Sequence, residues 1–323
     1  MSLKGVKTSH LALAATVVLW ASAFPAIRVG LNGLGAGGLS FLRLATASLA
    51  LALTAVPLRV RMPRPRDLPL IALSGLTGMT AYQLLLNWGE VHVPAGTASL
   101  LVATAPVYSV LLATALLGER LTARIAAGSA IAVAGSAVIA VAGGNARLSA
   151  SALVVLAAAI VQGVYHFASK PLLKRYTGVE VASYAMWTGT LFLVPLAPSA
   201  VRAAATAPPS ATASALYLGL LPSALGFVVW AYAVARLSMA SSTAALYLVP
   251  PVALAVAFVW LGEVPRLVEL AGGLISILGV VLINVQGRPL SASAGGGSDE
   301  NGDAGMDVQE EVALPARETA TPR

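Results

Sequence analysis

The sequence contains no cysteine, and only 10% of its 323 residues are charged, whereas 58% are hydrophobic. The lack of cysteine excludes disulfide bonds, thiolate metal sites and cysteine nucleophiles. Soluble domains carry about 25% charged residues, so the low charge excludes an ordinary soluble globular fold. The composition indicates a membrane protein.

Acidic residues are scarce everywhere except at the C-terminal end. Seven of the thirteen acids lie in the last 25 residues, in a region rich in Gly and Ser that begins near Gly287. A segment of this kind has no apolar period and buries too little surface to offset the entropy cost of ordering. We predict a disordered, acidic cytoplasmic tail over residues 287–323.

Long apolar segments fill the rest of the chain. A helix needs roughly 20 residues to cross a hydrocarbon core of about 30 Å. Ten segments reach about this length: 11–29, 37–57, 68–88, 95–117, 124–142, 149–168, 179–197, 213–235, 240–261 and 266–285. The sequence therefore predicts an all-α integral membrane protein with ten transmembrane helices.

Lys and Arg in the short loops predict the orientation of these helices. With a cytoplasmic N-terminus, thirteen basic residues fall on the cytoplasmic side and four on the outer side. Positive loop residues favour the cytoplasm, so the chain is expected to have both termini inside. The basic balance thus reports topology, and nucleic-acid binding is not expected because no folded soluble domain would carry it.

Two copies of one sequence pattern lie 144 residues apart. Residues 117–119 (Leu-Gly-Glu) match residues 261–263, within 11 identities over 36 ungapped positions that include a Pro and three Gly. Ala, Leu and Val coincide through composition alone, but Pro, Gly and Glu in register do not. A second offset, of 142, aligns residues 20–28 with residues 162–170. The chain is therefore predicted to be a duplication.

The two predicted repeats, residues 1–142 and 143–286, contain five spans each. Because five is odd, the second repeat enters the membrane from the opposite side. Inverted repeats recur in secondary transporters, where exchange between two packings opens either face. Glu119 then lies on the cytoplasmic side and Glu263 on the outer side, and Glu263 is expected to hydrogen-bond or cap at the start of the next helix.

Several motifs mark both repeats. The first helix ends with Trp20, Ala21, Ser22, Phe24 and Arg28, and the structural motif residues are Arg43, Pro106, Gly118, Glu119, Pro250, Gly262 and Glu263. This arrangement over residues 11–286 resembles the EamA family of the drug/metabolite transporter superfamily. The resemblance implies a ten-helix carrier, often an exporter of amino acids or other small metabolites, with a central cavity between the repeats. It implies no single substrate.

The third predicted helix carries a polar stripe. Thr80, Gln83 and Asn87 lie at i, i+3 and i+7, on one helical face. Their counterparts in the second repeat are Ala224, Phe227 and Ala231. The stripe is thus confined to one repeat, and we predict that it lines the cavity, since polar groups within a span are costly elsewhere. Hydrogen bonding between helices is the alternative for Gln83 and Asn87.

The sixth predicted helix carries a second polar face, formed by Gln162, Tyr165 and His166, which overlies the aromatic face of Trp20 and Phe24 in the first repeat. Tyr108 and Tyr247 lie deeper in their spans than the other aromatic residues and are candidate stacking partners. The predicted substrate-binding residues are Trp20, Phe24, Thr80, Gln83, Asn87, Tyr108, Gln162, Tyr165, His166 and Tyr247. For Gln162, Tyr165 and His166, hydrogen bonding between helices and placement at the membrane interface are the alternatives. For Arg43, within the second span, we expect an interhelical contact, with attraction of a substrate carboxylate as the alternative.

All six acids of the membrane portion lie at or near predicted span ends. No carboxylate is therefore expected at the midplane, where proton-coupled carriers often place a relay, and His166 is the titratable candidate. The sequence also lacks the motifs that a membrane enzyme needs, so no catalytic residue, metal or cofactor is predicted.

We predict a multi-pass transporter in the cell membrane that moves a small metabolite, an amino acid or similar amphipathic compound, by alternating access of its two repeats. Efflux is favoured by the family resemblance. Uptake or exchange of another metabolite class, and a non-transporting membrane scaffold or receptor, are the alternatives. The expected partners are a small-molecule substrate and the lipid bilayer, and the sequence leaves a homodimer open.

Overall fold

The computed structural model describes residues 3–117, 122–142, 149–234, 236 and 245–284. Within these ranges the chain forms helices, turns and short irregular connections, and no strand. In the part of the chain that the structure describes, seven helices are long and apolar enough to cross a membrane, and α13 and α14 are shorter apolar helices. The predicted all-helical membrane class is therefore confirmed. The predicted tail lies outside the described residues.

The first two predicted spans form one element, α1 (Leu3–Leu53), which is interrupted by a kink. Asn32, Gly33 and Gly35 have non-helical backbone angles there, with φ of +109° at Gly33 and +64° at Gly35. Only glycine adopts such angles without strain. A Cβ at Gly33 would also lie 2.7 Å from Cδ of Pro208, so the kink packs closely against the start of the helix that Pro208 precedes.

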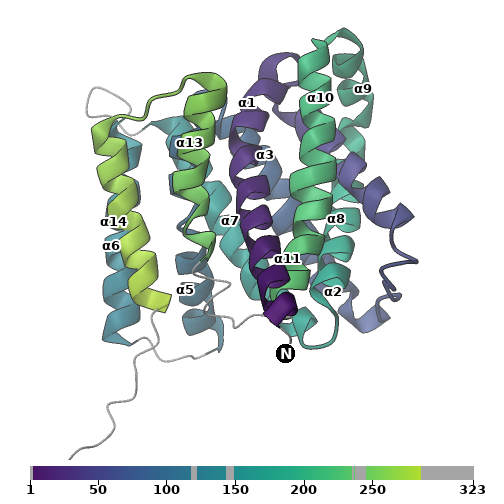
Figure 1. Ribbon diagram of the computed structural model, residues 1–323, viewed down its shortest axis with the longest axis horizontal. Coiled ribbons are helices and arrows are strands. Elements are labelled where there is room, and N and C mark those ends of the chain that lie inside the picture. The colour runs from purple at the N-terminus through teal and green to yellow at the C-terminus, as the bar shows by residue number, and fades with distance from the viewer. Residues whose placement is uncertain (1–2, 118–121, 143–148, 235, 237–244, 285–323) are drawn as a thin grey trace, which may run out of the picture. The chain divides into compact units, whose positions relative to one another are not determined.

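Most of the remaining helices lie within the predicted spans, but residues 197–206 form a further helix between two of them. In the first half they are η1 (Pro65–Asp67), α2 (Leu68–Ser74), the π-helix η2 (Gly75–Ala81), α3 (Tyr82–Gly89), α4 (Ala95–Val102), α5 (Ala105–Leu117) and α6 (Ala123–Ala142). In the second half they are α7 (Ala150–Leu173), α8 (Gly178–Leu193), η3 (Val194–Leu196), α9 (Ala197–Thr206), α10 (Pro209–Leu218), the π-helix η4 (Gly219–Leu225), α11 (Gly226–Val234), α13 (Val249–Leu261) and α14 (Leu267–Asn284). In Figure 1, α1 begins at one end of the bundle, and the α9–α10 turn and the α13–α14 loop lie at the opposite end.

Helices α6 and α14 pack against each other through glycines, and Figure 1 shows them side by side at one edge of the bundle. A Cβ at Gly135 would lie 2.5 Å from the carbonyl oxygen of Gly272, and one at Gly279 would lie 2.5 Å from that of Gly128. The two contacts are reciprocal, because Gly272 and Gly279 are the counterparts of Gly128 and Gly135 at the offset of 144. Without side chains, these glycines let the two helix backbones approach closely.

The same reciprocity recurs at the two π-helices. Gly75 in η2 packs on Thr188 of α8, and Gly219 in η4 packs on Thr46 of α1. The glycines are related by the offset of 144 and the threonines by the offset of 142. Two further counterparts, Ser48 and Thr190, touch each other directly through their hydroxyl oxygens at 2.7 Å. Each π-helix therefore packs on the second helix of the other half of the chain.

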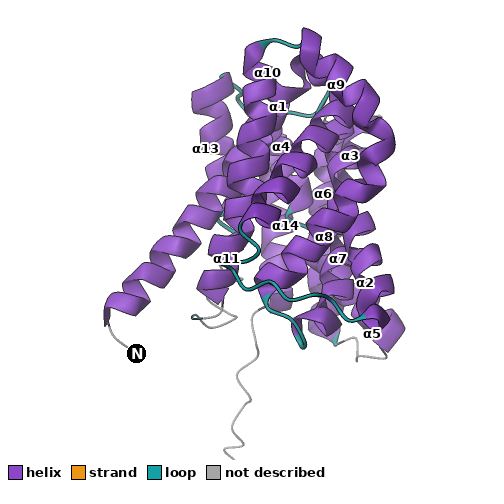
Figure 2. Cartoon of the chain, turned by 90° about the vertical axis from the view of Figure 1, so that its right-hand side faces the viewer, coloured by secondary structure: helices purple, strands orange, loops and turns teal. Residues whose placement is uncertain are grey.

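Figure 2 shows the same helices from the side, with short loops at both ends of the bundle. Large apolar side chains face outward at many positions, among them Leu191, Phe258 and Leu274, which are 67%, 59% and 60% exposed. An apolar exterior of this extent fits a lipid environment, since lipid tails are as apolar as these side chains.

Candidate functional site

The polar stripe predicted on the third span exists and is buried. Thr80 lies in η2, and Gln83 and Asn87 lie in α3. Their side chains are 7%, 3% and 0% exposed and face α8 and α1. The Thr80 hydroxyl donates to the carbonyl oxygen of Gly189 at 2.9 Å. The Asn87 amide donates to Oγ of Ser40 at 2.8 Å, while its Oδ1 has no hydrogen-bond partner among the described residues. The stripe thus combines bonds between helices with one unused acceptor.

Arg43 lies at the centre of this polar region. Its side chain is 7% exposed, its Nε donates to Oγ of Ser223 at 2.8 Å, and one terminal nitrogen donates to Oε1 of Gln83 at 3.1 Å. None of the ion pairs within the described residues includes Arg43. The interhelical contact expected for Arg43 is therefore present. Both acceptors are neutral, so the guanidinium charge remains uncompensated by a direct carboxylate bond, which is costly in a buried site.

Ser223 is a member of this region that the sequence did not point to. It lies in η4, where Gly219 allows the backbone to approach the carbonyl oxygen of Arg43. A small hydroxyl residue in an apolar span carries little signal, because such residues commonly bond to their own helix. Here the π-helical backbone and the close packing direct Ser223 to Arg43, so the first and second halves of the chain both contribute to the site.

Glu90 follows α3 and continues the stripe, since residues 83, 87 and 90 share one helical face. It is 0% exposed, and neither carboxylate oxygen has a hydrogen-bond partner among the described residues. Burial raises the pKa of the Glu90 carboxyl well above its usual range, and the charges of Arg28 and Arg43 oppose that rise. Sequence reasoning grouped Glu90 with the acids at span ends, although the spacing from Gln83 and Asn87 already placed it on the polar face.

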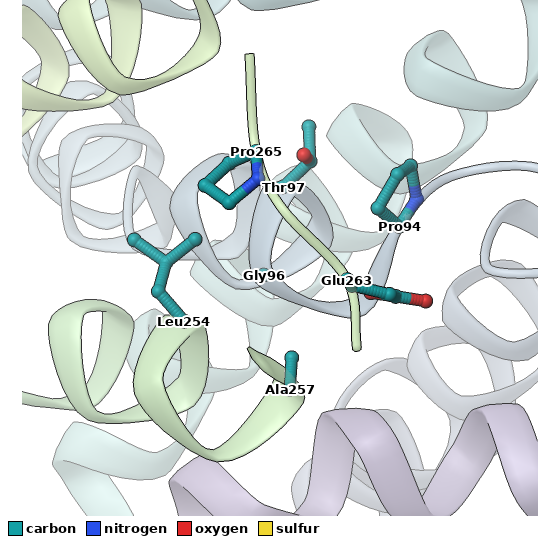
Figure 3. A pocket seen from close by; sticks show the side chains of 7 residues that line it. All are labelled: Pro94, Gly96, Thr97, Leu254, Ala257, Glu263 and Pro265. Atoms are coloured by element: carbon teal, nitrogen blue, oxygen red, sulfur yellow. The ribbon is translucent and has the colours of Figure 1, made fainter. Parts of the chain in front are cut away.

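Glu263 connects the α13–α14 loop to the first half of the chain. Its Oε1 accepts from Nε of Arg28 at 3.2 Å, and its Oε2 accepts from the backbone nitrogen of Ala95 at 2.8 Å. Figure 3 shows Glu263 beside Pro94, at the start of α4. Glu263 was expected to hydrogen-bond or cap at the start of the next helix, α14. In the structure it caps α4 instead. At α14 it is Glu269 that accepts from the backbone nitrogen of Arg266.

On α7, Tyr165 lies close to the polar stripe. It is 7% exposed, and a Cβ at Gly78 in η2 would fall 2.3 Å from its ring. The neighbouring His166 ring lies 5.6 Å from the Tyr165 ring. Gln162 is half-buried, and its Oε1 has no hydrogen-bond partner among the described residues. The polar face predicted on this helix therefore packs partly against η2 and retains an unused acceptor.

Trp20 and Phe24 take different positions. The Trp20 indole donates to the carbonyl oxygen of Pro222 at 3.1 Å, and its ring lies 5.4 Å from Phe227 and 5.3 Å from Trp230. Phe24 is 5% exposed and belongs to the main apolar core. Trp20 thus lies next to the π-helix that carries Ser223, whereas Phe24 is a core residue in this structure.

Tyr108 and Tyr247 lie apart from the stripe. The Cβ of Tyr108 packs against Gly163 on α7, and the Tyr247 hydroxyl donates to the carbonyl oxygen of Val280 at 3.4 Å. Among the motif residues, Pro106 is half-buried, Pro250 is buried, and Gly262 ends α13 with a φ of +68°. Gly118 and Glu119 lie outside the described residues.

Two hollows accompany these elements. One, beside Glu263 and Pro94, has about 10 Å³ and is too small for more than a water molecule (Figure 3). The other has about 300 Å³ and lies between α1 and the α13 region, lined mainly by apolar side chains such as Leu13, Val17 and Leu248. Neither hollow is lined by Arg43 or by the α3 stripe.

A model of the EamA-like transporter family matches the chain twice, over residues 7–141 and 149–285. The chain belongs to this family. A probable terminal-alkyne amino-acid exporter of Streptantibioticus cattleyicolor is 70% identical to it over 287 residues, which cover 88% of this chain and 97% of the relative. A probable amino-acid metabolite efflux pump of Salmonella typhimurium is 28% identical, with coverage of 84% and 92%.

A solved crystal structure supports the fold of this EamA-like protein. The two chains are 19% identical and align with a TM-score of 0.58. The alignment covers 89% of this chain and 99% of the solved one. The likeness concerns the fold alone. Together with the family match, the apolar helices make this EamA-like chain a multi-pass membrane transporter, and the family expected from its motifs is confirmed.

Proposed function

We propose that this EamA-like transporter exports a small amino acid by alternating access of two inverted repeats, residues 1–142 and 143–286. The proposed arrangement has ten transmembrane helices, both termini in the cytoplasm, and residues 287–323 as a disordered cytoplasmic tail. Its substrate is a zwitterionic α-amino acid with a short apolar or alkynyl side chain. The protein carries out transport without a chemical reaction on the substrate.

Reciprocal packing supports the inverted repeats. When two repeats are related by a two-fold axis, each contact between them occurs twice. If one residue contacts a second residue in the other repeat, the counterparts of these two residues also contact each other. The pairs Gly128–Gly279 and Gly135–Gly272 follow this rule, and they run in opposite directions along α6 and α14. Ser48 and Thr190 follow its special case, in which two counterparts touch each other on the axis. A two-fold axis in the membrane plane is the plan that alternating access uses.

The observation that carries the substrate class is the buried Arg43, whose described partners are the neutral Gln83 and Ser223. A guanidinium has five donors in a planar fork that matches a carboxylate. Donors of Arg43 thus remain for the carboxylate of an amino acid. Next to it, Tyr165, Met79 and Ala224 belong to one apolar cluster, which suits a short apolar side chain. The relative described as a probable terminal-alkyne amino-acid exporter supports the same substrate class.

Counterflow in proteoliposomes tests this proposal. Purified full-length protein is reconstituted with internal unlabelled L-propargylglycine, an α-amino acid with a terminal alkyne, and uptake of the labelled compound is followed. We expect uptake above empty liposomes, with competition by other small apolar amino acids. But-3-ynylamine, which lacks the carboxylate, and pent-4-ynoic acid, which lacks the amine, should compete weakly. Absence of flux with every member of a broad amino-acid panel would reject the proposal.

Arg43→Gln tests the role of the buried guanidinium. A hydrogen bond to a charged group contributes about 1.5–3 kcal/mol, so its loss should weaken half-saturation by roughly ten- to hundredfold. Arg202→Gln is the matched control, because Arg202 is exposed on α9. Equal half-saturation in the two variants would remove Arg43 from the binding site. Inside-out vesicles, in which export appears as uptake, test the direction.

A further inference from the structure

Glu90 has an arrangement that a purely structural carboxylate rarely has. It is fully buried directly after α3, and both of its side-chain oxygens lack a hydrogen-bond partner among the described residues. Other buried acids of the chain are bonded: Glu180 accepts from Arg61, Asp67 accepts from Tyr176, and Glu269 accepts from Thr97. A buried carboxylate without donors is expensive, so it is either neutral or compensated by a cation that binds there.

The charged and titratable groups around Glu90 come from three elements. On α1, Arg28 and Arg43 are close enough to interact with it electrostatically, and so are Tyr82 on α3 and Glu263 in the α13–α14 loop. Arg28 is already engaged, since it donates to Glu263 and to the backbone carbonyl oxygens of Glu90 and Val91.

The other groups near this region are neutral groups of α7 and one histidine. On α7, the groups that pack on Gly89 are the Val155 side chain and the Ser151 carbonyl, which are neutral. His92, two residues along the chain, lies 3.4 Å from the Ser151 hydroxyl through its Nδ1. The carboxylate of Glu90 is therefore left without a dedicated donor from any of these elements.

Three acceptor oxygens thus remain unused on one helical face: both oxygens of Glu90 and Oδ1 of Asn87, one turn away. An ammonium group has three donors and one positive charge, and it matches this set in number and sign. Arg43, three residues after the Ser40 that accepts from Asn87, supplies a positive charge nearby and donates to Gln83. The face therefore presents a cation-binding end and an anion-binding end, the two charges of an amino-acid zwitterion.

We propose that Glu90 is the coupling carboxylate of the transporter, which binds a proton and the ammonium group of the substrate in turn. The proposal rests on the function proposed above. In the state that is open to the cytoplasm, the Glu90 carboxylic acid releases its proton to water. The ammonium group of the substrate then binds to the carboxylate in place of the proton. On the outer side the substrate leaves and a proton from water returns to Glu90. One zwitterion leaves the cell as one proton enters.

Proton release on binding tests this exchange. L-Propargylglycine is added to purified full-length protein in weakly buffered detergent solution, and the proton change is read with a pH indicator while binding is measured by calorimetry. Wild-type protein should release about one proton per bound substrate below the pH at which Glu90 ionises. In that range its apparent Kd should fall about tenfold per unit rise in pH, since one proton competes with the ligand.

The variants separate coupling from a structural role. Glu90→Gln preserves the shape and removes a buried charge, so it should fold, release no proton and show a Kd that is flat with pH. Glu90→Asp keeps the carboxylate and should retain the release. Glu269→Gln is the matched control, because Glu269 is also a buried acid but accepts a hydrogen bond from Thr97, and it should release protons as the wild type does.

The outcomes also separate this inference from the proposed function. Binding by wild-type protein with no proton release and no pH dependence would overturn the coupling role and leave amino-acid transport intact. Proton release by Glu90→Gln equal to that of the wild type would overturn it as well. If the wild type binds and transports no amino acid of the panel, the proposed function fails, and the exchange built on it fails with it.

Discussion

At the scale of single residues, the candidate site depends on how Arg43 is held. Its Nε reaches Ser223 and a terminal nitrogen reaches Gln83, so one guanidinium links α1, α3 and η4. A buried charge with neutral partners gains less than one with a carboxylate, and its cost is offset only when its donors are satisfied. Removing one partner should therefore cost more than an ordinary hydrogen bond.

Ser223→Ala tests this argument. The substitution leaves Nε of Arg43 without its acceptor, and an unsatisfied buried donor costs about 1–3 kcal/mol. We expect a lower midpoint of thermal unfolding in detergent and weaker substrate binding. Ser199→Ala is the control, since Ser199 is exposed and its hydroxyl donates to the carbonyl oxygen of Leu196, three residues earlier. Equal midpoints in the two variants would show that Ser223 does not stabilise Arg43.

The residue scale also shows which parts of the site the sequence could predict. Arg43, Gln83 and Asn87 were recognisable because strongly polar side chains are rare within apolar spans. Ser223 was not, because a serine in a span carries no such signal and its direction follows from the η4 backbone. Glu90 was assigned to a span end, and its burial results from neighbours that are distant in sequence, such as Arg28.

At the scale of elements, helix packing follows small residues that the sequence displays openly. The glycines of α6 and α14 could be predicted to face a neighbour, because they stand seven residues apart in both copies. The cap of α4 could not, since Pro94 precedes that helix and offers no side-chain acceptor, and the acceptor comes from Glu263. Local propensity thus predicts helices and contact faces, whereas contacts between distant segments need the fold.

Gly135→Ala tests the α6–α14 contact. The new Cβ would fall 2.5 Å from the Gly272 carbonyl oxygen, so the helices must separate, at a cost of about 1–3 kcal/mol. Gly37→Ala is the control, because the nearest atom, in Leu196, is 3.4 Å from its Cβ position. By reciprocity Gly279→Ala should cost about as much as Gly135→Ala, and the double variant should cost less than their sum. Unchanged unfolding midpoints in both single variants would contradict the packing.

At the scale of the whole molecule, ion pairs join the two halves of the chain at two places. At one place Arg28 pairs with Glu263. At the other, Arg61 pairs with Glu180 through two bonds of 2.7 and 3.0 Å, and Arg175 pairs with Asp67. In each pair one partner belongs to the first proposed repeat and the other to the second. A rocking motion that opens one end must break the ion pairs at that end, so the proposed cycle requires the pairs of the two ends to break in alternation.

The proposed topology places these pairs on opposite sides of the membrane, and the natural lack of cysteine allows a direct test. Met62 and Thr206 are exposed and follow the second helix of the first and second proposed repeats. Inversion therefore requires Met62→Cys to be cytoplasmic and Thr206→Cys to be external. Val264 lies in the α13–α14 loop and is 74% exposed. Val264→Cys should therefore be external, like Thr206→Cys.

An impermeant maleimide applied to intact cells and to inside-out vesicles reads out these positions. Thr206→Cys and Val264→Cys should react in intact cells, and Met62→Cys only in inside-out vesicles, because a charged reagent does not cross the hydrocarbon core. The cysteine-free parent protein gives the background in both preparations. Reaction of Met62→Cys and Thr206→Cys from the same side would mean that the repeats are parallel, and parallel repeats have no two-fold axis in the membrane plane to support the proposed alternation.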